Sequence, residues 1–183
     1  MNDELTKANI QEIWQKIVAK LNEVSAKNQF NPAATPTQLQ KLETELGTEL
    51  PIALVSLLEC QNGSVDYFDQ IIVDSPFFST SQIASEWRTN CDVDEDSNAE
   101  IPPGGDLSDF WWHRRCIPVC GANGSGVCID SVSHQMYSYS SGMFGIDGPI
   151  APSLVEWIGR IADRLDADEY QFEDSKVSVE FHG

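Results

Sequence analysis

The chain contains 183 residues, of which 29 are acidic and 11 are basic, so its formal net charge at pH 7 is −18. This charge excludes a general DNA- or RNA-binding protein, because phosphate backbones are bound by surplus lysine and arginine, and it argues against docking on anionic membranes. Hydrophobic residues make up 41% of the chain, which is enough for the core of a single domain.

Three helices are expected in the first third of the chain. Apolar residues recur at steps of three and four over about Glu4–Ser25, which predicts an amphipathic helix. Thr35 has the sequence context of a helix cap, and Gly47 is placed to end this second helix in a left-handed conformation. Pro51 opens a third helix, which ends at the Asn62-Gly63 turn.

The pattern changes in the middle of the chain. Tyr67–Val73 has the composition of a strand, and Thr80 is placed to cap a short helix. Cys91–Asp109 is expected to form a loop, because it is rich in Asp and Glu, contains Pro102–Gly105 and has no usable period.

Strands dominate the next part of the sequence. Cys116–Cys120 and Gly126–Asp130 are apolar and rich in β-branched residues, and the glycine-rich stretch between them resembles a hairpin turn. Gln135–Ser140 alternates large and polar residues and is predicted to be the next strand. Ser153 is then expected to cap a C-terminal helix with an apolar stripe that ends at Leu165.

This order of elements favours an α+β fold over an alternating parallel-sheet fold, because helices come first, strands cluster in the middle and a helix follows. We expect one domain over residues 1–183 with its core at about 10–165. An acidic insertion lies at about 91–109. An acidic tail at 166–183 contains a weak strand-like stretch, Lys176–Phe181.

The sequence predicts a cytoplasmic protein. Its N-terminus lacks the basic start and unbroken apolar run of a signal peptide. The longest apolar stretches, such as Pro51–Leu58, are far shorter than the roughly 20 residues of a membrane helix. Five cysteines at irregular spacing favour free thiols in a reducing compartment.

The negative charge is concentrated in one segment. Glu59–Asp109 contains twelve acidic residues and a single basic one, Arg88, which gives this segment a net charge of −11. One interpretation is a solvated, mobile acidic loop. The other is a patch that attracts a basic protein surface and accelerates its association.

The second interpretation identifies candidate partner-binding residues in the acidic insertion and directly after it. Two adjacent tryptophans follow the insertion, and because neighbours in an extended segment point to opposite faces, one of them is expected to be exposed as an anchor. The candidate residues are Asp92, Asp94, Glu95, Asp96, Glu100, Asp106, Asp109, Trp111 and Trp112.

No catalytic, metal or cofactor site is predicted. His113, Cys116, Cys120 and Cys128 are of the ligand types that zinc prefers, but they lack a Cys-x2-Cys knuckle. The cysteines also lie in apolar runs, where free cysteine is commonly a small core residue. The chain contains neither a nucleophile elbow nor the lysine that would complete a phosphate-binding loop after Gly121–Gly126.

The order of these motifs resembles the SUKH superfamily, which includes fungal cell-wall assembly (glucan synthesis) regulators and bacterial toxin-immunity proteins. Leu42–Pro51, followed by Leu57-Leu58 and Gln61-Asn62-Gly63, is similar to its helix–Leu-Pro–helix–Asn-Gly signature. Further similar segments are Phe78–Ile83 with Trp87, the Ile-Pro strand Cys116–Val119, the Gly-rich turn and strand Gly124–Asp130, and the last helix, Ser153–Leu165.

This resemblance implies an α+β domain in which N-terminal helices and a C-terminal helix pack on a mixed, mainly antiparallel sheet. It implies protein binding without catalysis. The expected function is that of an immunity protein that binds and neutralises a cognate toxin, with a basic toxin such as a nuclease as the partner. The alternative is a regulatory scaffold of the cell-wall assembly type with several protein partners. Neither nucleic acid nor a membrane is expected to bind.

Overall fold

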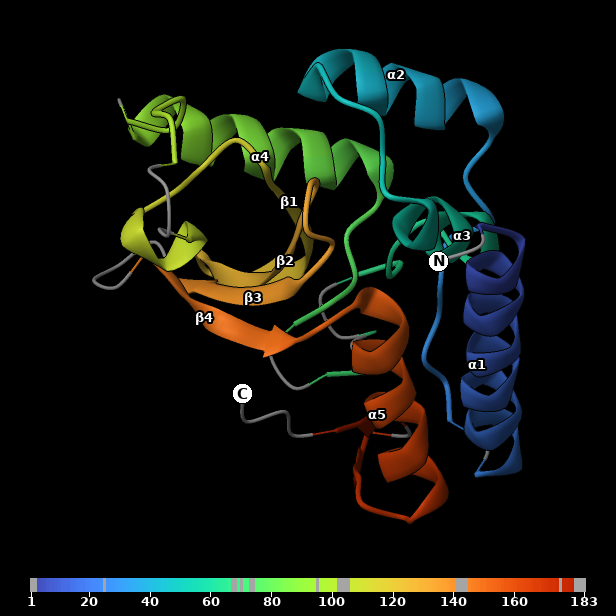
Figure 1. Cartoon of the computed structure of the whole chain (residues 1–183). Helices are drawn as coiled ribbons and strands as arrows, with labels where there is room; N and C mark the ends of the chain where they lie inside the picture. The colour runs from blue at the N-terminus through green and yellow to red at the C-terminus, as the bar shows by residue number, and fades with distance from the viewer. Residues whose placement is uncertain are drawn as a thin grey trace.

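The computed structural model describes residues 3–24, 26–66, 69, 71–72, 75–94, 96–101, 106–140, 145–174 and 176–179. Helices α1, α3 and α5 pack together at one end of the molecule, whereas α4 lies across one side of a curved sheet and packs against α2 (Figure 1). The elements are α1 (Asp3–Glu23), α2 (Pro36–Leu46), α3 (Ile52–Cys60), α4 (Thr80–Val93), η1 (Leu107–Asp109), β1 (Cys116–Ala122), β2 (Ser125–Asp130), β3 (Met136–Ser140), β4 (Gly145–Ala151), α5 (Leu154–Asp166), β5 (Gln171–Glu173) and β6 (Lys176–Ser178). The predicted α+β class and the placement of the helices are confirmed.

The first three helices form close to where the sequence predicts them. Helix α1 buries one stripe that runs from Thr6 to Leu21 at steps of three and four. The side chain of Thr35 caps α2, and Gly47 ends it at a φ of 67°. Because glycine has no Cβ, it adopts this left-handed conformation at little cost.

The predictions for α4 were wrong in two respects. Ser79, not Thr80, is the N-cap: its side chain accepts a hydrogen bond from the backbone N–H of Gln82, whose side chain accepts one from the Ser79 N–H. The helix has 14 residues and continues to Val93. The predicted loop therefore begins at Asp94, three residues later than Cys91.

The Asn62-Gly63 turn that follows α3 positions the start of α4 on the rest of the domain. The side-chain oxygen of Asn62 accepts a hydrogen bond from the Thr80 backbone N–H at 2.8 Å. Gly63 has a φ of 83°, and a Cβ added there would lie 2.3 Å from the backbone nitrogen of Ser79. The Asn-Gly pair thus allows the end of α3 to approach the start of α4.

The sheet is antiparallel with strand order β1-β2-β3-β4. Asn123 and Gly124 form the β1–β2 turn at φ values of 53° and 77°, which confirms the predicted hairpin. Strand β4 was not predicted. Its two glycines and Pro149 weaken the strand pattern, and its pairing with β3 has register shifts around Tyr137.

Aromatic rings join α1, the segment before α4, and α5. Trp14 and Trp157 each meet Phe77 edge-on, with 6.2 Å between ring centroids in both pairs. The helix capped by Ser153 is confirmed, and its apolar stripe through Leu165 is fully buried.

The predicted acidic tail contributes to the hydrophobic core, which extends past the predicted limit near residue 165. Val177 and Val179 are 1% and 0% exposed. The Asn28 side chain donates to the Val177 carbonyl and accepts from its N–H, at 2.9 and 2.8 Å. Lys176 Nζ lies 2.6 Å from a carboxylate oxygen of buried Asp69.

Two predicted strands fall partly outside the described residues. Of Tyr67–Val73, the structure describes positions 69, 71 and 72, and Ile72 makes only isolated bridges, to Ser75 and Val179. Of Lys176–Phe181, it describes 176–179, which contain β6. Within the described part of the chain, no helix combines the length and apolar character that a membrane span requires.

Candidate partner-binding surface

The acidic insertion begins where α4 ends and returns to the sheet through η1. Asp92 and Val93 lie in the last turn of α4 and are exposed. The carboxylate of Asp106 caps η1 by accepting hydrogen bonds from the backbone N–H and the hydroxyl of Ser108. These bonds lower the pKa of Asp106.

Three contacts hold the first half of the insertion against the segment that leads into β1. Asp94 Oδ2 accepts from the Trp112 backbone N–H at 2.9 Å, the Ser97 carbonyl accepts from the Arg114 N–H at 2.9 Å, and His113 Nε2 lies 3.0 Å from the Ala99 carbonyl oxygen. They bring together residues 14 to 18 positions apart. The described residues between Asp94 and Ala99 are therefore packed on the domain.

The predicted site residues divide into exposed and structural groups. Asp94 is half-buried, and its two oxygens accept backbone N–H groups of Asp96 and Trp112. Glu95 lies outside the described residues. The exposed acidic residues are Asp92, Asp96, Glu100, Asp106 and Asp109.

The exposed carboxylates are not neutralised by the basic residues that the structure describes. Every ion pair among the described residues uses other acids, such as Glu45 with Arg88 and Asp130 with Arg115. Arg88, the one basic residue of the −11 segment, is therefore directed toward α2 and not toward the insertion. The negative charge of these exposed carboxylates faces solvent.

The two adjacent tryptophans differ in accessibility. Trp112 is 1% exposed and packs edge-on against Tyr139, with 5.2 Å between ring centroids. Its burial removes Trp112 from the predicted surface residues. Trp111 is only partly buried at the edge of the core, so it is the more accessible of the pair.

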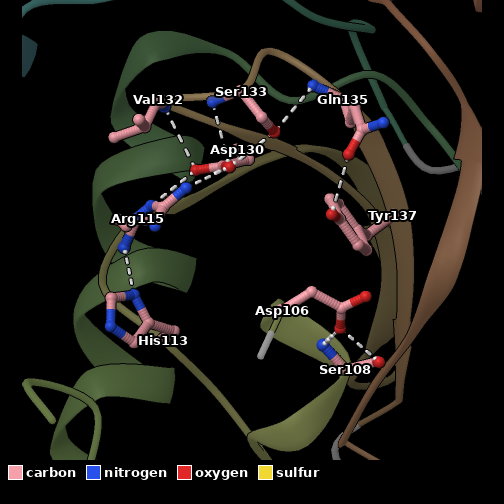
Figure 2. A network of polar contacts seen from close by, with 9 residues as sticks. All are labelled: Asp106, Ser108, His113, Arg115, Asp130, Val132, Ser133, Gln135 and Tyr137. Carbon is pink, nitrogen blue, oxygen red and sulfur yellow. Dashed lines mark hydrogen bonds and ion pairs between the residues drawn. The ribbon is translucent and has the colours of Figure 1, made fainter. Parts of the chain in front are cut away.

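The sequence interpretation missed a buried ion pair that fixes the end of β2 (Figure 2). Asp130 is 1% exposed, and the guanidinium of Arg115 donates to both of its carboxylate oxygens. The same oxygens accept the backbone N–H groups of Val132 and Ser133 at 3.1 and 3.0 Å. In the sequence, Asp130 is marked only as the end of a segment that resembles a family motif, and no local pattern indicates its pairing with Arg115.

This network controls both the local charge and the shape of the β2–β3 turn. Burial acts to raise the pKa of Asp130, but the hydrogen bonds from Arg115 and Ser133 outweigh it and leave the pKa lowered. The carboxylate therefore stays ionised and holds the turn, which presents Val132 at 68% exposure.

The geometry gives no support to zinc binding by the histidine and cysteines considered above. Within the described ranges, no group of three or more His, Cys, Asp or Glu residues is arranged to hold a metal ion. Burial raises the pKa of Cys120 to about 12. Burial is also the main cause that raises the pKa of Cys116 well above its ordinary value. Both thiols are therefore protonated at neutral pH, which suits core packing.

Comparison with known families agrees with this architecture. The model of the SMI1 / KNR4 family (SUKH-1) matches residues 33–160, a range that includes α2 to β4, the acidic insertion and most of α5. No curated protein matches the chain. Domains of this family are in general non-catalytic immunity or regulatory domains that bind protein partners. Because the match covers well over half of the chain, the chain belongs to the SMI1 / KNR4 (SUKH-1) family.

Proposed function

We propose that this chain is a cytoplasmic immunity protein that binds a cognate toxin with a basic surface and thereby neutralises it. The observation that carries this proposal is the set of exposed, unneutralised carboxylates on the insertion, with Asp96 and Glu100 at its centre. A toxin that cleaves nucleic acid needs a basic surface to hold phosphates. An acidic inhibitor can cover that surface and block access to it.

The insertion is suited to binding because part of it is ordered before a partner arrives. The contacts of Asp94, Ser97 and Ala99 with the segment leading into β1 fix its first half. A surface that is already ordered loses less conformational entropy when it binds. Trp111 and Val93, which is 64% exposed, supply apolar contact area beside the charges.

The experiment starts from the genomic neighbourhood of the coding sequence. The protein encoded beside it is co-expressed with this chain, purified and titrated by calorimetry at low and high salt. We expect a stable complex whose affinity falls as the salt concentration rises, together with loss of the toxic activity. A neighbouring protein that does not bind, or that binds without salt dependence, would contradict the electrostatic mechanism.

A further inference from the structure

His113 is a buried contact between the acidic insertion and the sheet, and both of its ring nitrogens are used. His113 is 5% exposed. Its Nδ1 accepts the backbone N–H of Arg115 at 3.1 Å, as Figure 2 shows. An accepting nitrogen carries no proton, so in the neutral ring the proton is on Nε2, which donates to the Ala99 carbonyl at 3.0 Å.

A second proton does not fit this site. Protonated Nδ1 would be a donor that points at the donor N–H of Arg115, and this contact would be lost. Arg114 and Arg115 place positive charge nearby and disfavour a cationic ring, whereas Asp130 favours it. The carboxylate of Asp130 is already engaged by Arg115 and the β2–β3 turn. Beside η1, the ring packs at a steep angle against the uncharged ring of Phe110, with 5.1 Å between centroids.

These opposing effects leave the pKa of His113 lowered. Burial is the largest cause, and the hydrogen bond to Ala99 opposes it without overcoming it. The docked insertion therefore favours the neutral imidazole, and release of the insertion would expose the ring to solvent, where histidine titrates near pH 6.5.

We propose that His113 is a pH-sensitive latch whose protonation releases residues 96–100 of the insertion from the sheet. The released state binds a proton more readily than the docked state. The docked state is therefore fully stabilised above about pH 6.5 and loses stability as the pH falls through the lowered pKa of the docked histidine. This latch does not depend on the proposed toxin-binding function.

Hydrogen exchange of the whole chain tests the latch directly. The amides of Arg114 and Arg115 donate to the Ser97 carbonyl and to His113, so their protection reports on docking. After correction for the intrinsic exchange rate, we expect their protection to fall between pH 7 and pH 5 by at most about tenfold per pH unit, because one proton is involved. Carboxylic acids ordinarily titrate near pH 4, below this range.

Two variants separate His113 from other titrating groups. His113→Gln keeps a donor for Ala99 but cannot titrate, so the pH dependence should disappear. His134 is exposed, and His134→Gln should keep the wild-type dependence. The latch is refuted if protection in the wild type does not change with pH, or if the change persists in His113→Gln.

A direct titration keeps the test decisive if His113→Gln does not fold. The imidazole resonances of His113 in the wild-type chain should titrate at the lowered pKa of the docked ring, and the loss of amide protection at Arg114 and Arg115 should fall between that midpoint and about pH 6.5. A loss of protection outside this range would show that another group controls docking.

Discussion

The carboxylate of Asp94 accepts a hydrogen bond from the backbone N–H of Trp112, with 2.9 Å between Oδ2 and the nitrogen. Asp94 lies near the start of the acidic insertion and Trp112 just after its end, 18 positions apart, so their contact closes its base. The other oxygen of Asp94 accepts the N–H of Asp96. An acid that the sequence assigns to partner binding thus organises the surface that presents the others.

Replacing Asp94 should therefore weaken the fold more than replacing its exposed neighbour. Asp94→Ala leaves two backbone N–H groups without their acceptor and should lower the free energy of unfolding by about 1–2 kcal/mol. Asp96→Ala removes an exposed carboxylate and should change it by less than about 0.5 kcal/mol. Urea unfolding measures both, and equal effects would contradict the structural role of Asp94.

Gly63 should tolerate no side chain. A Cβ there would lie 2.3 Å from the Ser79 nitrogen, and the φ of 83° is strained for other residues. We expect Gly63→Ala to destabilise the chain by more than about 2 kcal/mol in thermal or chemical unfolding. Gly148→Ala is the matched control, because a Cβ at Gly148 meets nothing within 4 Å, and its effect should be small.

The buried pair of Asp130 and Arg115 gives a prediction with a pH dependence. Asp130→Asn leaves the guanidinium without its counter-charge and should cost about 2–4 kcal/mol of unfolding free energy at pH 7. Because Asp130 has a lowered pKa when folded, its contribution is present above the unfolded value near 4 and is lost as the pH falls through the folded value.

Thermal unfolding between pH 7 and pH 3 checks this dependence. The difference in unfolding free energy between the wild type and Asp130→Asn should become smaller as the pH falls. Asp166→Asn, which changes an exposed acid, serves as the control and should stay within about 0.5 kcal/mol of the wild type at pH 7. A difference that is constant across the range would show that Asp130 does not act through its charge.

The segment beyond α5 should prove essential to stability. Val177→Ala removes buried methyl groups and should lower the unfolding free energy by about 1–3 kcal/mol. Phe172 in the neighbouring strand is 53% exposed, so Phe172→Ala should cost less despite the larger change in volume. A larger cost for Phe172→Ala would contradict the observed burial of Val177 and exposure of Phe172.

Local signals in the sequence predicted most of the fold. The cap at Thr35, the left-handed Gly47 and the Asn123-Gly124 turn all depend on neighbouring residues, and the structure confirms them. Strand β4 depends on pairing with β3, which overrides its weak composition. The backbone of buried Val177 is held by hydrogen bonds with the Asn28 side chain, 149 positions away. Such distant contacts leave little pattern in a single sequence.

The candidate site was predictable in charge but not in arrangement. Composition placed the negative charge on the insertion, and the structure shows Asp96 and Glu100 exposed. Composition did not distinguish Asp94, which bonds to the backbone, from its neighbours, nor could the alternation of faces decide which of Trp111 and Trp112 is buried. Those outcomes depend on contacts with Tyr139 and with the segment before β1.

Whether the proposed toxin binds the acidic insertion is tested most directly by the rate at which charge-reversed variants associate with that toxin. The double variant Asp96→Lys/Glu100→Lys reverses two charges of the insertion. The double variant Asp163→Lys/Asp166→Lys makes the same change in net charge at exposed positions of α5. We predict that the first variant associates at least about tenfold more slowly at low salt, and that the second stays much closer to the wild type. Equal rates for the two variants, or an unchanged rate for the first, would contradict binding through the acidic insertion.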